Sequence, residues 1–315
     1  MKKWIYSILT TLLIAGGAVL CVVRWQAWFG MPEEKPWNGQ QRAYTFPFFE
    51  HDTTPEELTI LVLGDIHNRL TRADYDTLAA RVPHIDAVAQ TGDWLDRGQD
   101  YYYQYLLREW TNSELFGTPI IPCPGNHEYS KGLTKELSPV WDKAFPRPHN
   151  GPVEVPGASY YVDYPSVRFI VIDTNPLDRL VWLTRTLTWL RELMYSAEDR
   201  FVVVMMHHPV LSPGKGRCNP LIYAAFRNAL GEADLVIAGH DHSYMRQGPF
   251  VVLNTAGKTK AQHIRCEADV ADTVPTYSVL SVKRTEVSYQ PSPLTFNTYR
   301  LSDGQVVDIV YVKHH

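Results

Sequence analysis

The sequence predicts an α/β fold, and three patterns in the 315-residue chain lead to this class. From about residue 58 to residue 238, short apolar runs rich in β-branched residues alternate with helix-like stretches. Beyond residue 250 the chain is rich in strand-like runs. Short polar clusters directly follow most of the early runs. Open α/β sheets bind ligands at the carboxyl ends of their strands, so these clusters mark the expected site.

Periodicity and turn residues predict the elements in order along the chain. Strands are expected at residues 58–63, 87–91, 119–123, 159–163, 167–173, 201–206, 235–238, 251–254, 276–282, 285–289, 296–301 and 306–312. Helices are expected at residues 72–81, 101–110, 138–145, 180–195 and 221–230. The fourth helix is the clearest, since Leu183, Leu187, Leu190 and Met194 form one apolar stripe at helical spacing.

The composition excludes some classes of function. Apolar residues make up 45% of the chain, enough for a sizeable core, and the formal net charge is −4. This negative net charge argues against electrostatic binding of nucleic acid, so we expect no nucleic-acid partner. The four cysteines form no CxxC pair, which argues against a thiolate zinc site. Cys218 and Cys266 either form a disulfide, if the domain lies outside the cytosol, or remain free thiols.

The N-terminus has the pattern of a membrane anchor. An uncharged apolar run at residues 4–23 follows Lys2 and Lys3, and its length is near the ~20 residues that a helix needs to cross a bilayer. The two lysines outweigh Arg24 behind the run, which favours a cytoplasmic N-terminus. We expect a single-pass protein of the cell membrane, with one transmembrane helix and an extracytoplasmic domain. The alternative is a secreted domain, because small residues at 15–18 offer a signal cleavage site.

The rest of the chain divides into a linker and one domain. Residues 1–30 form the anchor or signal, residues 31–54 the linker, and residues 55–315 the domain. The linker contains three prolines with polar residues between them. It also contains aromatic side chains that can dock it onto the domain, namely Tyr44, Phe46, Phe48 and Phe49.

Five polar clusters carry the chemistry of the chain. They are Gly64-Asp65-Ile66-His67, Gly92-Asp93-Trp94-Leu95-Asp96-Arg97-Gly98, Gly125-Asn126-His127-Glu128, His207-His208-Pro209 and Gly239-His240-Asp241-His242. A single aspartate after a strand usually serves a turn or a helix cap. Together, however, the clusters supply the mixture of Asp, His and Asn side chains that two adjacent divalent metal ions bind. The five clusters therefore predict a binuclear metal centre.

Taken in order, these clusters resemble the calcineurin-like metallophosphoesterase superfamily over roughly residues 58–257. The shared pattern is Asp65-x-His67, Gly92-Asp93, Gly125-Asn126-His127-Glu128, His207 and Gly239-His240-x-His242. The run from Gly239 to Arg246 is similar to purple acid phosphatases, and the run from Gly92 to Gly98 is similar to phosphoprotein phosphatases. The resemblance implies a four-layer α/β/β/α sandwich of two mixed sheets, with two metal ions at the strand ends.

The resemblance also implies the ligands of both ions. The seven implied ligands supply carboxylate, imidazole and amide donors, which suit Mn, Fe, Zn or Co. They are Asp93 as a bridge between the ions, Asp65, His67 and His242 on the first ion, and Asn126, His207 and His240 on the second.

Three further residues are implied to act on the substrate. His127 is expected to protonate or orient the leaving group as a general acid. Asp96 is expected to orient His127, and Arg97 to bind a phosphate oxygen. The alternative for Asp96 and Arg97 is a plain surface ion pair.

Two neighbours of these residues are expected to lie outside the chemistry. Glu128 is expected to be solvated or to cap a helix. His208 is expected to point away from the ligand before it, as strand alternation requires.

These features predict a hydrolase of phosphate esters, a phosphomonoesterase or phosphodiesterase, that uses a metal-bridged hydroxide. The expected partners are a small-molecule or lipid phosphate ester and, through the N-terminal helix, the membrane. The alternative is a pyrophosphatase acting on nucleotide or lipid-linked diphosphates. A binding protein on a degenerate fold would have lost ligands, and all seven are present in the sequence.

Overall fold

The computed structural model describes most of the chain after residue 43. The described residues are 44–49, 57–130, 136–177, 179–211, 220–255, 268–283 and 294–312, with the side chains of residues 220–223 excluded. The predicted membrane segment, the Cys218 and Cys266 pair and the expected strand at residues 285–289 lie outside this set. No helix within the described residues combines the length and apolar character that crossing a bilayer requires.

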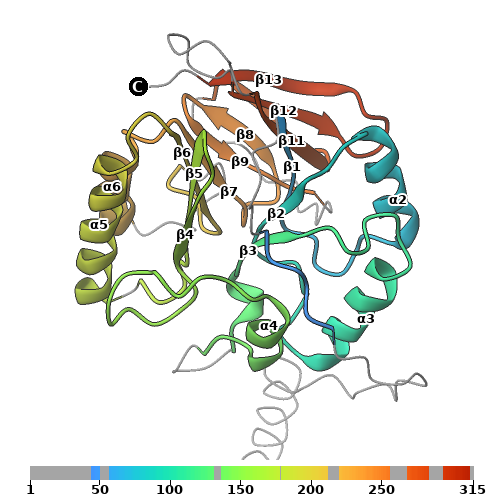
Figure 1. Ribbon diagram of the computed structural model, residues 1–315, viewed down its shortest axis with the longest axis horizontal. Helices are drawn as coiled ribbons and strands as arrows, with labels where there is room; N and C mark the ends of the chain where they lie inside the picture. The colour runs from blue at the N-terminus through green and yellow to red at the C-terminus, as the bar shows by residue number, and fades with distance from the viewer. Residues whose placement is uncertain are drawn as a thin grey trace, which may run out of the picture. The chain divides into compact units, whose positions relative to one another are not determined.

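Two mixed β-sheets form the centre of the domain (Figure 1). The first sheet has the order β13-β12-β11-β1-β2-β3 and consists of β1 (Glu57–Leu63), β2 (Ala87–Thr91), β3 (Ile120–Cys123), β11 (Thr276–Lys283), β12 (Leu294–Arg300) and β13 (Val306–Val312). The second has the order β10-β8-β9-β7-β6-β5-β4 and consists of β4 (Tyr160–Asp163), β5 (Val167–Ile172), β6 (Phe201–Met206), β7 (Leu235–Ala238), β8 (Tyr244–Gln247), β9 (Phe250–Val252) and β10 (Val270–Asp272). Strands β1, β2 and β3 are parallel, as are β5, β6, β7 and β9.

Helices cover the outer faces of both sheets. They are α2 (Arg72–Arg81), α3 (Asp100–Trp110), α4 (Pro139–Ala144), α5 (Leu180–Tyr195) and α6 (Pro220–Leu230). A 3-10 turn, η1 (Asn126–Glu128), follows β3. Figure 1 shows α2 and α3 beside the first sheet and α5 and α6 on the opposite side, beside the second. The expected arrangement of two mixed sheets flanked by helices is confirmed.

Side-chain alternation along the strands builds the layers. In β1, Ile60 points between the two sheets, whereas Leu61 packs in the core that includes α2 and α3. In β6, Val203 points between the sheets and Val204 packs in the core that includes α5 and α6. Both faces of these strands are therefore buried, which explains why their sequences read as continuous apolar runs.

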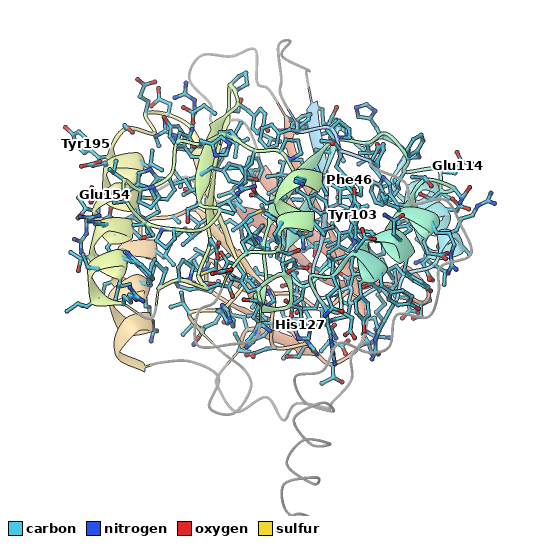
Figure 2. All side chains as sticks on the ribbon, turned by 90° about the horizontal axis from the view of Figure 1, so that it is seen from below. Phe46, Tyr103, Glu114, His127, Glu154 and Tyr195 are labelled. Atoms are coloured by element: carbon cyan, nitrogen blue, oxygen red, sulfur yellow. The ribbon has the colours of Figure 1, made fainter. Side chains whose placement is uncertain are left out.

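Residues 44–49 dock onto the domain, as the aromatic residues of the linker predict. Phe46 is fully buried and stacks on Phe145, with ring centroids 4.6 Å apart. Its centroid also lies 5.7 Å from that of Trp94, which follows the predicted bridging aspartate. Tyr103 of α3 donates a hydrogen bond from its hydroxyl to the carbonyl of Tyr44, and Figure 2 shows Tyr103 and Phe46 on the same side of the domain. The end of the linker is thus part of the core around α3.

Three short elements were not expected from the sequence, namely the strands β8 and β10 and the turn η1. Strand β10 has three residues, and none of them is buried, so it lacks an apolar run. Strand β8 ends in the polar residues Arg246 and Gln247. Pairing with a neighbouring strand holds each in place, as where Arg246 lies opposite Val270. Such pairing is a tertiary effect that the local sequence does not carry.

Candidate metal centre

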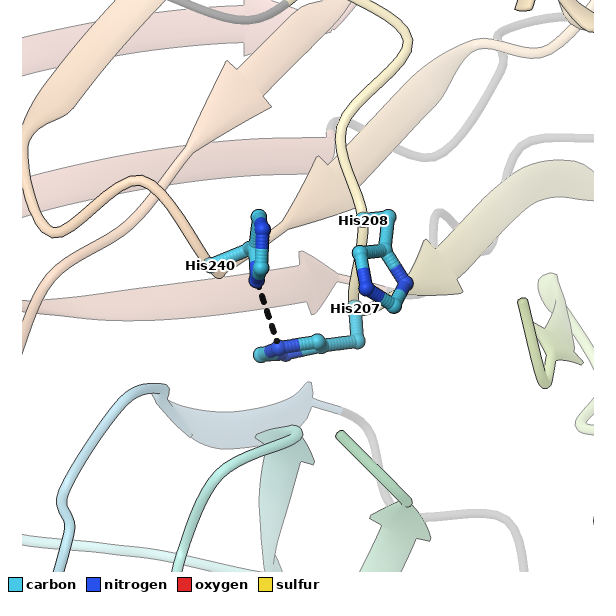
Figure 3. A group of neighbouring side chains, drawn as sticks. All are labelled: His207, His208 and His240. Atoms are coloured by element: carbon cyan, nitrogen blue, oxygen red, sulfur yellow. Dashed lines mark hydrogen bonds between the residues drawn. The ribbon is translucent and has the colours of Figure 1, made fainter. Parts of the chain in front are cut away.

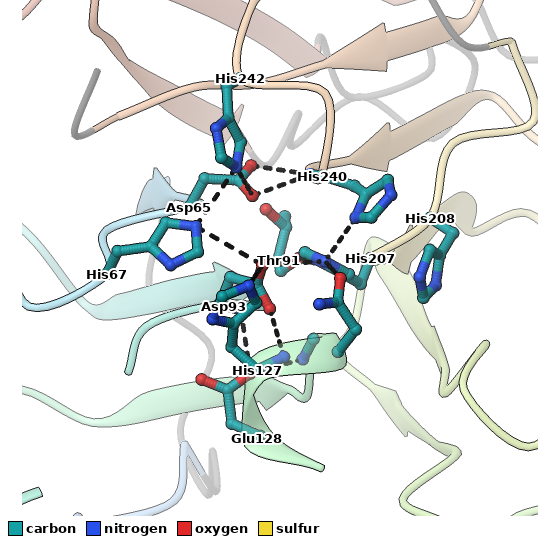
Figure 4. Close-up of polar contacts among 12 residues, drawn as sticks. Asp65, His67, Thr91, Asp93, His127, Glu128, His207, His208, His240 and His242 are labelled. Carbon is teal, nitrogen blue, oxygen red and sulfur yellow. Dashed lines mark hydrogen bonds and ion pairs between the residues drawn. The ribbon is translucent and has the colours of Figure 1, made fainter. Parts of the chain in front are cut away.

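Five strand ends carry the polar clusters and meet at one place (Figure 4). The loops after β1, β2 and β3 come from the first sheet, and those after β6 and β7 come from the second. Within each set the strands are parallel, so their carboxyl ends lie on one edge of the sheet. The two edges are joined where the backbone N–H of His240 donates to both carboxylate oxygens of Asp65, at 2.9 and 2.8 Å. All seven predicted ligands lie in these loops.

Five of the seven predicted ligands have a left-handed backbone. The φ angle is 54° at Asp65, 49° at His67, 52° at Asp93, 75° at His240 and 51° at His242. Such angles cost an L-residue about 1–3 kcal/mol each and cluster at functional sites. The pairs Asp65/His67 and His240/His242 therefore do not lie on extended strands, because the chain turns as soon as each strand finishes. These turns direct both members of a pair into the same space.

Two glycines allow the loops to approach one another. A Cβ atom at Gly92, where φ is 97°, would lie 2.4 Å from Nδ1 of His207. A Cβ atom at Gly125 would lie 2.2 Å from Oδ1 of Asp93. Any side chain at either position would therefore push predicted ligands of different loops apart.

The first group of donors consists of Asp65, His67, Asp93 and His242, with one donor atom of each within 4.8 Å of the others. Nε2 of His67 lies 3.2 Å from Nε2 of His242 and 3.5 Å from Oδ2 of Asp93. Nε2 of His242 lies 3.5 Å from Oδ1 of Asp65. The group contains the three ligands predicted for the first ion and the predicted bridge.

The second group of donors surrounds His207. Its Nε2 lies 3.1 Å from Oδ1 of Asn126, 3.2 Å from Nδ1 of His240 and 3.4 Å from Oδ2 of Asp93. Its other ring nitrogen, Nδ1, lies 3.0 Å from the backbone carbonyl of Thr91, which fixes the ring. The structure thus brings together the ligands predicted for the second ion. The carboxylate of Asp93 lies between the two groups.

The charges in the cluster fit a divalent cation. Burial alone would raise the pKa of Asp93, but His207, His127 and His67 around it lower the pKa well below its usual value. Burial alone would lower the pKa of His207, yet Asp93 and Asp65 raise it to about 9. The proton that this raised pKa favours lies on Nε2 of His207, the ring nitrogen that faces the other donors. A metal ion binds such a site by displacing that proton.

The family model of the calcineurin-like phosphoesterases matches residues 58–244, more than half of the chain. The chain belongs to this family. It is therefore a metal-dependent hydrolase that acts on phosphoester bonds.

Several relatives are similar to this phosphoesterase. It is 26% identical over 193 residues to the glycerophosphodiester phosphodiesterase GpdQ of Enterobacter lignolyticus, a match that covers 58% of this chain and 66% of that protein. Its structure is similar to that of purple acid phosphatase PPD1 from yellow lupin seeds, with a TM-score of 0.63 and 16% identity over 83% of this chain and 54% of that one. It is also similar to GAP50, the anchor in the inner membrane complex of Plasmodium, with a TM-score of 0.57 and 14% identity over 82% and 89% of the two chains. At these identities the two structures show the fold alone.

Glu128 ties two loops of the phosphoesterase together. It is fully buried, so the expectation of a solvated carboxylate is wrong. Its Oε2 accepts the backbone N–H groups of Asp93 and Gly125 at 2.9 and 2.7 Å, and its Oε1 accepts that of Leu95 at 2.9 Å. Burial and the charge of Asp93 raise the pKa of Glu128 to about 7, against the effect of these N–H groups. The bond to Gly125 caps the turn η1, which was the alternative expectation.

His208 joins the second group of donors instead of pointing away (Figure 3). Its ring centroid lies 4.9 Å from that of His207 and 4.4 Å from that of His240. The expectation fails because β6 ends at Met206, so strand alternation no longer applies at the next residues. The hydroxyl oxygen of Thr174 lies 2.7 Å from Nδ1 of His208 and fixes its ring.

The three residues predicted to act on the substrate have different surroundings. Nε2 of His127 lies 3.9 Å from Oδ2 of Asp93, and its Nδ1 donates to the backbone carbonyl of Asp96 at 2.6 Å. The carboxylate of Asp96, which was the expected acceptor, lies 3.5 Å from Nδ1 of His67. Arg97 is half-buried. Burial raises the pKa of Tyr102, and the positive charge of Arg97 opposes this effect. Contact between Arg97 and a phosphate oxygen stays a prediction.

Proposed function

We propose that this phosphoesterase hydrolyses phosphate esters with two divalent metal ions bound side by side in the donor cluster. The observation that carries the proposal is the position of Oδ2 of Asp93, which lies 3.5 Å from Nε2 of His67 and 3.4 Å from Nε2 of His207. A carboxylate shared by two groups of donors suits a pair of ions about 3.5–4 Å apart. A degenerate fold without activity would have lost donors, whereas all seven converge here.

The residues of the chain complete the chemistry. When bound, the two ions neutralise the charge of the ester and lower the pKa of a bound water. A backbone carbonyl only accepts hydrogen bonds, so Nδ1 of His127 carries a hydrogen and its Nε2 faces the donor cluster. When protonated, this Nε2 donates to the leaving-group oxygen as a general acid. Arg97 binds a non-bridging oxygen of the phosphate.

We propose phosphodiesters as the favoured substrate class. The support is the sequence similarity to a protein named as a glycerophosphodiester phosphodiesterase, over 58% of this chain. Phosphomonoesters and the diphosphates of nucleotides or lipids are the alternatives, and one substrate panel separates the three. We also propose that the N-terminal apolar run holds the domain on the outer face of the cell membrane. Phosphate esters derived from lipids would be available there as substrates.

The substitution Asp93→Asn tests the two-metal proposal in the full chain. We expect wild-type protein to hold two equivalents of Mn²⁺, Zn²⁺, Fe or Co²⁺ and to hydrolyse bis-p-nitrophenyl phosphate faster than p-nitrophenyl phosphate or diphosphate. The variant should lose activity and most of its metal, because one oxygen serves both donor groups. The exposed Asp199→Asn is the matched control and should retain both. A variant with normal turnover and normal metal content would remove Asp93 from the bridge.

A further inference from the structure

One ring nitrogen of the predicted ligand His67 lacks a hydrogen bond. Its Nε2 faces the other donors of the first group, so the hydrogen of the neutral ring must lie on Nδ1. That Nδ1 is buried and makes no hydrogen bond within the described part of the chain. A buried N–H without an acceptor is destabilising, because it has lost its hydrogen bond to water. The ring therefore requires an acceptor on its outer side.

The carboxylate of Asp96 lies where that acceptor is needed. Its Oδ1 is 3.5 Å from Nδ1 of His67, slightly beyond hydrogen-bonding distance. The Asp96 side chain is 34% exposed, whereas that of His67 is completely buried. The carboxylate therefore has room to move, and a shift of about half an ångström would make the bond.

Hydrogen bonds between two loops hold Asp96 at this place. The backbone N–H of His67 donates to the carbonyl of Asp93 at 2.9 Å, and that of Asn68 donates to the carbonyl of Trp94 at 3.0 Å. The side-chain oxygen of Asn68 then accepts the backbone N–H of Asp96 at 2.7 Å. The loop after β1 and the loop after β2 are thus joined along their length. The position of Asp96 beside His67 follows from this pairing.

We propose that Asp96 is the positioning residue for His67, and that its carboxylate accepts the Nδ1–H and so presents Nε2 to the first metal ion. The proposal rests on the two-metal function proposed above. Carboxylates that contact metal-binding histidines in this way fix the tautomer and the orientation of the ring. Asp96 thereby sets the metal affinity of the first donor group.

The second donor group does not depend on this carboxylate. The Nδ1 of His207 lies 3.0 Å from the backbone carbonyl of Thr91. The general acid His127 also uses a backbone carbonyl, that of Asp96 itself, which a side-chain substitution leaves in place. Removal of the Asp96 carboxylate should therefore affect one metal ion and spare both the other ion and the orientation of His127.

Metal titration of the full chain tests the proposal. In equilibrium dialysis with Mn²⁺, Asp96→Ala should weaken one of two binding equivalents about 10–100-fold and leave the other unchanged. Asp96→Asn, which keeps an acceptor without its charge, should lie between Asp96→Ala and wild type. Asp100→Asn, on the same segment but 3.4 Å from Nε2 of Gln104, is the matched control and should bind both ions as wild type does.

Kinetics at saturating Mn²⁺ separate this role from the orientation of His127. With both sites filled, the Asp96 variants should show the wild-type ratio of rates for aryl and alkyl esters. Unchanged affinity for both ions would overturn the proposal, and a rate loss confined to poor leaving groups would assign the carboxylate to His127. A wild-type chain that binds one ion would contradict the two-metal function instead. In that case the pairing of Asp96 with His67 still predicts weaker binding of an ion that occupies the first donor group, and unchanged binding there would overturn it.

Discussion

His127 differs in its exposure from the neighbouring histidines that are predicted metal ligands. Its side chain is 24% exposed, whereas those of His67 and His207 are completely buried. The ring stands edge-on to that of His67, with centroids 4.6 Å apart and an interplanar angle of 85°. A ring that is more exposed than the buried histidines beside it suits a group that meets the substrate.

Substitution of His127 separates proton donation from metal binding. We expect His127→Ala to retain both metal ions and the fold, because the ring is not among the seven ligands. The rate should fall by up to ~10²–10⁴-fold for an ester with an alkyl leaving group and far less for an activated aryl ester, which needs no proton. Rates for matched alkyl and aryl phosphodiesters, together with metal analysis, measure both effects.

The control for this substitution is His84→Ala. His84 is exposed and pairs with Asp86 at 3.0 Å, outside the loops that carry the donors. It should leave both rates unchanged. Equal losses for the two esters in His127→Ala would exclude proton donation, and loss of metal would make His127 a ligand.

Motif spacing was sufficient to predict that seven polar side chains lie close together, because each follows a strand whose apolar run is evident. It was not sufficient for contacts that depend on how the loops fold. The partner of His67 on its outer side comes from the loop pairing around Asn68, and the burial of Glu128 comes from the approach of two loops. His208 joins the donors because its strand ends at Met206, so side-chain alternation does not extend to residues 207 and 208. Each of these features is a tertiary contact.

At the scale of elements, Glu128 connects the loop after β2 with the turn η1 after β3. Three backbone N–H groups, those of Asp93, Leu95 and Gly125, point at its two oxygens. These N–H groups are buried with it, so they need this acceptor to remain satisfied. The carboxylate thus maintains the backbone that positions a predicted bridge and a predicted general acid.

The substitution Glu128→Gln should weaken this connection. The amide NH₂ of glutamine cannot accept a hydrogen bond, so at least one of the three N–H groups loses its partner. Such a loss costs about 1–3 kcal/mol. We expect a lower melting temperature and weaker metal binding, measured by thermal unfolding and metal titration. Glu192→Gln, an exposed change on α5, is the control. Unchanged stability and metal affinity in Glu128→Gln would contradict the role of this carboxylate.

The fold was largely predictable because both faces of the central strands are buried. The strands β1, β5, β6 and β7 appear in the sequence as predominantly apolar runs, and each matches its expected position closely. The strands β8 and β10 have no such run and form by pairing with each other. The sequence also contains no local signal for the left-handed turns at the ligands, because Asp and His adopt them here under tertiary constraint.

At the scale of the whole domain, the donor cluster connects the two sheets. The first group takes Asp65, His67 and Asp93 from the first sheet and His242 from the second. The second group takes Asn126 from the first sheet and two histidines from the second. A metal ion held by either group would therefore cross-link the sheets at the edge where the strands end.

The proposed membrane topology is tested on intact cells. If the N-terminal run spans the membrane with Lys2 and Lys3 inside, added protease should digest residues beyond about 30, a boundary set by the ~20-residue span. A cytoplasmic marker protein should survive the same treatment. Digestion only after lysis would show the opposite orientation. Release of the domain into the medium would show that the signal is cleaved.

Metal binding should stabilise the domain increasingly as the pH rises from 6.5 to 9. Without metal, the pKa of His207 is raised from 6.5 to about 9, mainly by Asp93 against the effect of burial. The charged pair therefore contributes its full stability below pH 6.5, and the contribution is lost as the pH rises through 9. Metal must displace the same proton, so proton competition weakens over this range. In thermal unfolding of the full chain, the metal-free melting temperature should fall with pH while the increase caused by saturating Mn²⁺ grows. Asp93→Asn should lose both trends, whereas a metal-induced increase that shrinks towards pH 9 would show that His207 does not exchange its proton for the ion.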